Sequence, residues 1–299
     1  MSPDTIRSAA SRPANGLLLT AIAGGLALAQ PAGAAPRQTA ASVTCRLETV
    51  ATGSVKSILD GRTFVLTDGR EVRLAGIEVP PLPEPATPAP INVAVAPGTA
   101  ASASDPGLAA AATLQALVGG REVALKHSKF VTDRYGRILA DAVAAGIESP
   151  SAIKSLLAQG LARLAAHAGE PACVTELRAA ERTARATKLG LWGDPRYFPK
   201  TADDPAGVLA ERGRFTLVEG KVVSVRESGG TIYMNFGQRW SEDFTVTILK
   251  RNERQFTAAG LALRSLAGRR VLVRGWIEER GGPWIEATEP QQIEVIADK

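Results

Sequence analysis

A hairpin signal around residue 68 constrains the fold of this chain more than any other feature. Asp68-Gly69 stands between two segments of alternating apolar residues, 63–67 and 71–77. A tight two-residue turn needs a positive φ angle at both positions, and Asp and Gly are among the residues that accept it. A third strand-like segment, 54–59, precedes the pair. The sequence therefore predicts that three strands open a β-rich domain.

The segments that follow mix helices and strands. In order, they are predicted as a helix near 108–118, strands at 122–127 and 138–144, a helix from Ser149-Pro150 to 159, and a helix at about 173–188. Residues 80–106, rich in Pro, Ala, Ser and Gly, are expected to form a long mobile loop. Asp133 and Gly136 are expected to build the turn between the two strands, with Tyr135 packed beside it.

The pattern changes after about residue 200 and indicates a second β-rich domain. Its predicted elements are strands at 215–225, 231–236 and 244–249, a helix at 253–266, and strands at 270–278 and 284–296. Three strands, a helix and two strands are the order of an OB-type Greek-key barrel. We therefore expect a mainly β chain of the α+β class: a five-stranded OB-type barrel with helices, followed by a second OB-like barrel. The predicted domains are 36–200 and 212–299, with a linker at 201–211.

The first 35 residues have the pattern of a cleavable secretory signal peptide. Arg7 and Arg12 precede an apolar run at 16–30, and small residues follow at 31–35, so cleavage is expected near Ala34. A membrane anchor is the alternative, although the run is shorter than the roughly 20 residues that a span needs. We expect a periplasmic or secreted protein without stable membrane insertion after cleavage.

Charge and cysteine content add two expectations. The net charge of +5 and the pI near 9.4 favour contact with polyanions such as nucleic acid. The chain has two cysteines, Cys45 and Cys173, whose spacing matches no metal-site pattern. In an oxidising compartment an even count favours a single disulfide, and two separate buried thiols are the alternative.

Four separated stretches form an ordered set of motifs. They are VKSILDGRTFVL at 55–66, VRLAGIEVP at 72–80, DRYGR at 133–137, and GLARL at 160–164 leading to GLW at 190–192. In this order the chain resembles the staphylococcal-type thermonucleases over about residues 45–195. The resemblance implies their barrel fold, and it is more specific for fold than for activity.

For catalysis, the resemblance implies a Ca²⁺ ion held by carboxylates, a Glu as general base, and two arginines that neutralise the phosphate in the transition state. Both arginines are present, as Arg73 and Arg137. Glu78 stands at a metal-ligand position where the family has Asp. Arg62 replaces a second metal ligand, and Pro81 replaces the general base. Arg73, Arg137 and Glu78 are therefore the catalytic positions that persist, and Glu78 is the most that remains of the metal site.

These replacements predict a degenerate active site beside Asp60. Losing a general base lowers a rate by about 10²- to 10⁴-fold. Arginine suits anion binding because its guanidinium pairs with phosphate in a bidentate manner. We expect no cofactor, and an anion site of Arg62, Arg73 and Arg137 that binds nucleic acid or another polyanion without efficient cleavage.

Several alternatives stay open. The chain could be an active phosphodiesterase, either metal-independent or with Ca²⁺ as cofactor, or it could be a structural protein of the cell envelope. Glu84 could swing in from the loop as a base, although a solvated loop charge is the simpler interpretation. Arg73 and Arg137 could serve only as ion-pair partners of Glu78 and Asp133.

The remaining candidates give weaker signals. His127 and His167 lie far apart in the sequence and are interpreted as surface residues. The chain also lacks the tyrosines that a nuclease would have just after 160–162. In the second domain, aromatic residues stand among arginines, which suits single-strand binding, although we favour a core role for some of the aromatics. The residues concerned are Tyr233, Phe236, Trp240, Trp276 and Trp284, with Arg226, Arg239, Arg269, Arg270 and Arg274, and the core role is favoured for Tyr233, Phe236 and Trp276.

Overall fold

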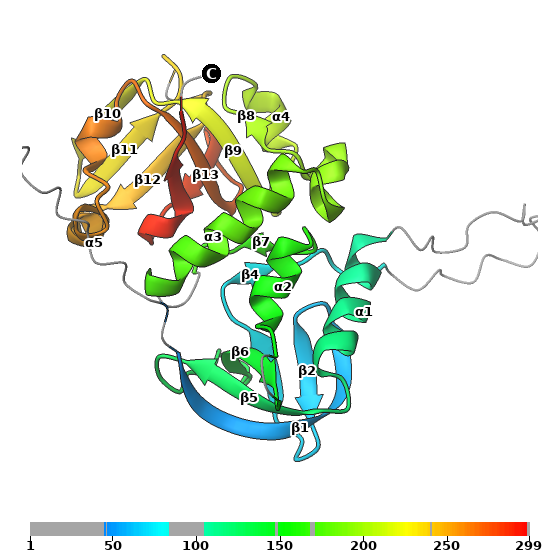
Figure 1. Cartoon of the computed structure of the whole chain (residues 1–299). Helices are drawn as coiled ribbons and strands as arrows, with labels where there is room; N and C mark the ends of the chain where they lie inside the picture. Colours follow the sequence, from blue (N-terminus) through cyan, green and yellow to red (C-terminus); the bar gives the residue numbers. More distant parts are fainter. Residues whose placement is uncertain are drawn as a thin grey trace, which may run out of the picture. The chain divides into compact units, whose positions relative to one another are not determined.

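The computed structural model describes residues 45, 47–83, 105–146, 149–167, 171–239 and 241–297 (Figure 1). The signal peptide predicted for 1–35, most of the loop predicted at 80–106, Glu84 and Trp240 lie outside these ranges. Within them, no helix combines the length and the hydropathy that crossing a membrane requires. Residues 43–299 group together as one unit.

The first part of the chain forms a closed barrel of five strands in the order β1-β2-β3-β6-β5. The strands are β1 (Glu48–Asp60), β2 (Thr63–Leu66), β3 (Glu71–Leu74), β5 (Glu122–His127) and β6 (Ile138–Ala144). β3 and β6 run parallel and the other pairs are antiparallel. Figure 1 shows β1 as a long curved strand, and it pairs with β2 through one half and with β5 through the other. The predicted mixed fold and its three-strand opening are confirmed, although β1 begins earlier than the predicted strand at 54–59.

The predicted hairpin is present, but its turn differs from the expected one. Four residues, 67–70, connect β2 to β3, and Leu66 donates from its backbone to the Arg70 carbonyl at 2.9 Å. Gly69 has φ of +88°, whereas Asp68 does not have a positive φ. Asp68 instead accepts a hydrogen bond from the Arg70 backbone N–H through its carboxylate, at 3.0 Å. The loop is therefore longer than a two-residue turn and needs only one left-handed residue.

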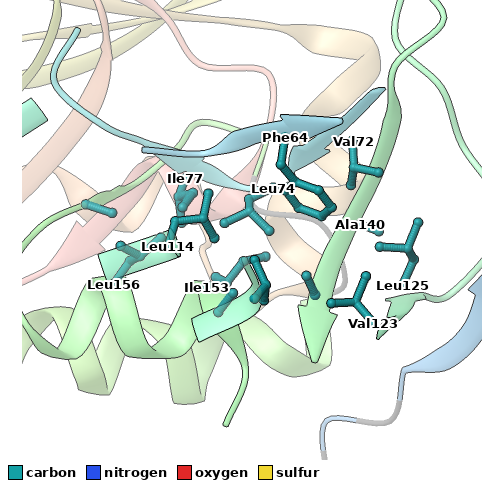
Figure 2. Close-up of a cluster of buried hydrophobic side chains, with 14 of the residues drawn as sticks. Phe64, Val72, Leu74, Ile77, Leu114, Val123, Leu125, Ala140, Ile153 and Leu156 are labelled. Atoms are coloured by element: carbon teal, nitrogen blue, oxygen red, sulfur yellow. The ribbon is translucent and has the colours of Figure 1, made fainter. Parts of the chain in front are cut away.

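Three helices cover the barrel: α1 (Pro106–Val118), α2 (Ala152–Ala158) and α3 (Pro171–Ala186). Side-chain caps begin two of them, since Asp105 accepts from the backbone N–H of Gly107 and Leu108, and Ser151 accepts from that of Lys154. The predicted helix start at Ser149-Pro150 is therefore two residues early. Figure 2 shows strand and helix side chains meeting in one buried cluster, which includes Phe64, Leu74, Leu114 and Leu156. Each such side chain contributes about 1.5–3 kcal/mol through burial.

Two glycines explain how the GLARL and GLW segments pack together. Gly160 ends α2 with φ of +68°, and a Cβ there would lie 2.2 Å from the Leu189 carbonyl oxygen. Gly190 has φ of +51°, and its Cβ would lie 2.5 Å from the Gly160 carbonyl oxygen. That carbonyl accepts a hydrogen bond from the Leu191 backbone at 2.8 Å. The two turns touch backbone to backbone, so neither position tolerates a side chain.

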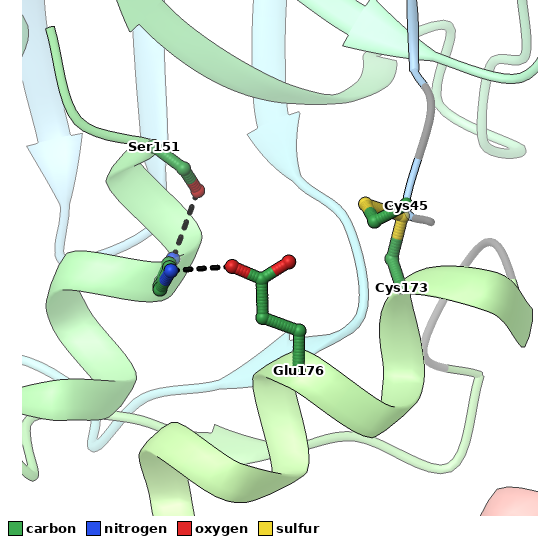
Figure 3. The surroundings of a disulfide bond; sticks show 5 residues. Cys45, Ser151, Cys173 and Glu176 are labelled. Carbon is green, nitrogen blue, oxygen red and sulfur yellow. Dashed lines mark hydrogen bonds and ion pairs between the residues drawn. A yellow bond between two sulfur atoms is a disulfide. The ribbon is translucent and has the colours of Figure 1, made fainter. Parts of the chain in front are cut away.

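A disulfide joins Cys45, just before β1, to Cys173 in the first turn of α3 (Figure 3). The expected pairing is confirmed, and the alternative of two free thiols is wrong. Nearby, Glu176 forms an ion pair with Lys154 of α2. The disulfide therefore ties the start of the barrel to the helix that leads toward the second part.

The second part contains two sheets, ordered β10-β11-β12-β15-β14 and β16-β13-β9-β8. The strands are β8 (Lys200–Thr201), β9 (Phe215–Lys221), β10 (Ser224–Ser228), β11 (Thr231–Asn235), β12 (Thr245–Leu249), β13 (Arg270–Trp276), β14 (Glu278–Arg280), β15 (Gly282–Glu286) and β16 (Ile293–Val295). β12 and β15 run parallel, as do β8 and β9. Three predicted strands, 215–225, 270–278 and 284–296, are each split, so two separate sheets stand where one closed barrel was expected.

Two further segments differ from prediction. The single helix expected at 253–266 is a short α5 (Glu253–Ala258) followed by a 3₁₀ turn at Leu263–Leu266. The segment predicted as a linker ends in α4 (Pro205–Leu209), and Val208 is fully buried in the second core. This segment is part of the packed structure because its apolar side chains enter that core.

Buried charges join α3 to the β13 strand. Arg274 is 0% exposed, and its guanidinium lies 2.9 Å from Glu181 Oε2 on α3 and 3.3 Å from Glu294 Oε2 on β16. It also donates to the Leu164 carbonyl at 3.1 Å. Arg182 of α3 reaches Glu294 at 2.6 Å. The single-strand role considered for Arg274 is therefore wrong, since this side chain connects the two parts of the chain instead.

Candidate functional site

The loop between β1 and β2 places Arg62 against Glu78. Gly61 lets the loop pack on α1, because a Cβ there would lie 2.6 Å from the Ala110 Cβ. The Asp60 carboxylate accepts from the Arg62 backbone N–H at 2.8 Å and fixes the turn. The short strand β4 (Ile77–Glu78) then brings Glu78 Oε2 to 2.6 Å from Arg62 Nη1, which also donates to the Ile77 carbonyl at 2.8 Å. Both side chains are largely buried, so a guanidinium neutralises this carboxylate directly.

The other two arginines of the predicted anion site lie close by. Arg73 lies on β3, and burial, followed by the positive charges of Arg62 and Arg137, lowers the pKa of its guanidinium. Because repulsion between like charges falls with distance, the three guanidinium groups lie near one another. Among the described residues, the Arg73 side chain has no ion pair. The suggested Arg73–Glu78 pair is therefore absent, and Arg62 is the partner of Glu78 instead.

Arg137 ends the turn that begins at Asp133, and Asp133 holds its side chain in place. Its Nε and Nη2 each lie 2.7 Å from Asp133 Oδ2, so the suggested Arg137–Asp133 ion pair is confirmed. Burial alone would raise the pKa of Asp133, but hydrogen bonds from the Arg137 side chain and the Tyr135 and Arg137 backbones lower it. Gly136 completes the turn with φ of +80°, as predicted. Tyr135 is 66% exposed rather than packed, and its ring faces the guanidinium groups of Arg134 and Arg137.

These residues do not fit a hard divalent cation. Such an ion needs several free oxygen ligands, whereas the Arg62 backbone occupies Asp60 Oδ1 and the Arg62 side chain occupies Glu78. Across the described ranges, no group of three or more His, Cys, Asp or Glu side chains could hold a metal. Pro81, which the resemblance aligns with a general base, is exposed, and its side chain has no group that can accept a proton.

Two adjacent hollows open at this site. The first, of about 790 Å³, is lined by Asp60, Pro81 and Arg163 among others, and the second, of about 600 Å³, is lined by Arg73. Four residues line both hollows: Arg62 and Glu78 from the first part of the chain, and Phe215 and Trp276 from the second. We call the two hollows together the groove. Both parts of the chain therefore contribute to its walls.

Several residues of the groove were missed or misjudged from the sequence. His127 and His167 both line the second hollow, although they are distant in sequence. Trp276 is 52% exposed and does not fill the core. Tyr233 is also exposed, at 37%, whereas Phe236 is buried as favoured. The alternation of β13 could not reveal the exposure of Trp276, because this tryptophan is the last residue of that strand.

Arg163 is the most notable residue that sequence reasoning passed over. It lies on β7 (Arg163–Leu164), which pairs with β4, and its guanidinium stands between the rings of Tyr197 and Phe215, at 5.6 and 5.2 Å from their centroids. Burial lowers the pKa of Arg163. Its Nε is buried and has no hydrogen-bond partner. The spacing of residues in the sequence does not show that residues 163, 197 and 215 lie together in the fold.

The closed barrel and its helices agree with the fold that the resemblance to the thermonucleases implies. Residues 71–194 match the family model described as staphylococcal nuclease homologue. The chain therefore contains a staphylococcal nuclease-like domain, which is consistent with a function related to nucleic acid. The matched range includes Arg73, Glu78, Arg137 and Arg163, whereas Trp276 lies beyond it. Among curated proteins, none matches this chain.

Proposed function

We propose that this protein binds nucleic acid or another polyanion at its staphylococcal nuclease-like domain and does not cleave it efficiently. The observation that carries the proposal is the 2.6 Å ion pair between Arg62 and Glu78. A divalent cation at Glu78 would have to displace this guanidinium or lie beside it. Two unit charges about 4 Å apart repel by about 4 kcal/mol at an effective dielectric near 20, and the second charge of the ion doubles this cost.

Three arginines support anion binding at the same place. Arg73 and Arg62 line the second hollow, and the Arg137 charge is close enough to lower the pKa of Arg73. A phosphate would relieve the repulsion among these guanidinium groups, each of which offers several N–H donors. Anion binding by these arginines needs no metal ion and no cofactor.

An active phosphodiesterase, Ca²⁺-dependent or metal-independent, is the second candidate. The retained Arg73 and Arg137 favour it, because they stand where the resemblance places transition-state contacts. Pro81 weighs against it, since losing the base costs about 10²- to 10⁴-fold in rate. A structural role in the cell envelope is the third candidate.

We also propose that the protein acts in the periplasm or outside the cell. The Cys45–Cys173 disulfide supports an oxidising compartment, and the predicted signal peptide at 1–35 would direct export. The lack of a membrane-spanning helix among the described residues is compatible with this location.

For residues 215–295 we infer an OB-type arrangement. β9 and β10 are separated only by Val222-Val223, and β13 and β14 only by Ile277. Joining each pair into one bent strand gives the cyclic pairing order of an OB barrel, with β12 and β15 parallel and α5 before β13.

The test combines binding and cleavage on the purified protein. Binding of a labelled single-stranded DNA should fall steeply as salt rises, and no digestion is expected with Ca²⁺. Digestion that a chelator stops would overturn the proposal in favour of the phosphodiesterase. Absence of any binding would leave the structural role.

A gain-of-function variant tests the reasoning about the site. Arg62→Asp combined with Pro81→Glu restores the carboxylate and the base that the resemblance calls for, and Ca²⁺-dependent digestion should appear. The control is Arg70→Asp, which makes the same charge change as Arg62→Asp alone, on the neighbouring β2–β3 hairpin, and should give no activity. If the double variant neither binds Ca²⁺ in calorimetry nor digests DNA, the Arg62–Glu78 pair is not what prevents cleavage.

A further inference from the structure

The second part of the chain contributes an aromatic platform to the groove. Trp276, at the end of β13, is 52% exposed, and its ring meets the edge of Phe215 with centroids 6.3 Å apart and planes at 69°. Phe215 is only 5% exposed, so this buried ring restricts the orientation of the tryptophan side chain. A half-exposed tryptophan loses part of the free energy that full burial would provide. An exposed aromatic ring that lines a hollow is therefore a candidate stacking surface for a ligand.

The groove beside Trp276 is cationic. Five arginine and lysine side chains and three carboxylates line the first hollow. Arg214 is the most accessible groove cation from the second part: it is 74% exposed, and its nearest carboxylate, Glu211, is 3.6 Å away. Glu211 is itself engaged by Lys200 at 2.9 Å. Arg214 is therefore only weakly neutralised and can contact an anion.

Arg163 gives a second, independent sign of an anionic ligand. This side chain forms no hydrogen bond or ion pair with any described residue, and its Nε is buried without a partner. The charges of Glu181 and Glu78 attract this guanidinium from beyond ion-pair distance, so part of its burial cost is offset, but its N–H groups still lack a direct acceptor. Because Arg163 lines the first hollow, a phosphate in that hollow would supply the missing partner.

We propose that the two parts of the chain together bind one unpaired nucleic-acid strand, with a base stacked on Trp276 and the flanking phosphates on Arg163 and Arg214. This inference rests on the proposed function and assigns its ligand class and contacts. A duplex is a poor fit, because its bases are stacked on one another and their faces are covered. Trp276 and Arg214 lie outside the matched range of 71–194, so the second part replaces the stacking residues that the motif at 160–164 lacks.

The test uses fluorescence anisotropy on the full protein with chelator present. The probes are a labelled oligothymidine DNA strand and a labelled duplex of equal length. Trp276→Ala should weaken binding of the single strand by roughly 5- to 150-fold, the range for loss of one stacked base, and should change duplex binding little. Trp276→Phe should retain most of the affinity, because a phenyl ring still stacks.

A second variant keeps the proposal testable if Trp276→Ala fails to fold. Arg214→Glu changes an exposed side chain, and it should weaken binding and reduce the dependence of affinity on salt. Its matched control is Arg239→Glu, since Arg239 is 71% exposed and also pairs with a glutamate three residues away. The control for the aromatic is Tyr233→Ala, on a different sheet.

The outcomes separate this inference from the proposed function. Unchanged affinity in Trp276→Ala, or an equal loss in Tyr233→Ala, would overturn the shared groove while leaving polyanion binding intact. Equal affinity for strand and duplex would overturn the assignment to unpaired bases. If the unaltered protein binds neither probe, both proposals are wrong.

Discussion

The buried Arg274 network gives a prediction whose size follows from the structure. Arg274→Met removes a cation that is 0% exposed and keeps a side chain of similar length and apolar character. Glu181, also 0% exposed, would then keep only the Leu164 N–H as a donor, at 2.7 Å. Removing one partner of a buried ion pair typically costs about 3–5 kcal/mol, because the remaining charge is left uncompensated.

Urea denaturation measures this cost. For a slope of roughly 2–3 kcal/mol/M, the expected loss shifts the midpoint by about 1–2.5 M. The control is Arg264→Met, which breaks a 2.6 Å pair with Glu227 at a site where the arginine is 63% exposed, and the midpoint should hardly shift because water screens this pair.

A double variant examines the cause of the loss. Adding Glu181→Gln to Arg274→Met removes the stranded charge while keeping an acceptor for the Leu164 backbone, so it should recover much of the lost stability. A loss below about 1 kcal/mol in the single variant would refute the reasoning. A double variant as unstable as the single one would show that packing, not the unpaired carboxylate, is responsible.

Two further predictions concern stability. Burial alone would raise the pKa of Glu294, but the hydrogen bond from Arg182 and the charges of Arg274 and Arg185 outweigh it and lower the pKa below its ordinary value of 4.5. The free energy of unfolding should therefore fall as pH drops from about 4.5 through the lowered pKa. Glu294→Gln should reduce this dependence of the unfolding free energy on pH, which urea titrations at several pH values measure. Replacing Cys45 with Ser, which opens a loop of sequence separation 128, should lower stability by about 2–4 kcal/mol, whereas an unchanged melting curve would contradict a structural role for the bond.

Local patterns were sufficient to predict the barrel. Alternation at 63–67 and 71–77, with Gly69 between them, determines which side chains face the core, and the strands formed where this pattern is clear. The second part was harder, because β9 and β10 form one apolar run that bends at Val222-Val223. Periodicity does not reveal a bend within a strand, so a single strand was predicted where two sheets share it.

The residues of the candidate site also fall into those that the sequence could predict and those that it could not. Arg62, Arg73, Glu78 and Pro81 were found because they lie within motifs, where each residue has a fixed place. Arg163 was inside a motif but was not recognised, since its surroundings come from residues 197 and 215. Contacts of this kind depend on how separate segments pack, and no spacing in the sequence records them.

β13 links the stability of the molecule to its proposed ligand. Arg274 and Trp276 are two residues apart on this strand, so both side chains leave the same face of the sheet. One anchors the strand to α3 through Glu181, and the other lines the groove. The position of the stacking platform relative to Arg62 therefore depends on a buried charge pair. It follows that Arg274→Met should weaken single-strand binding, although Arg274 touches no ligand. The salt dependence of the affinity should change little, because the phosphate contacts remain.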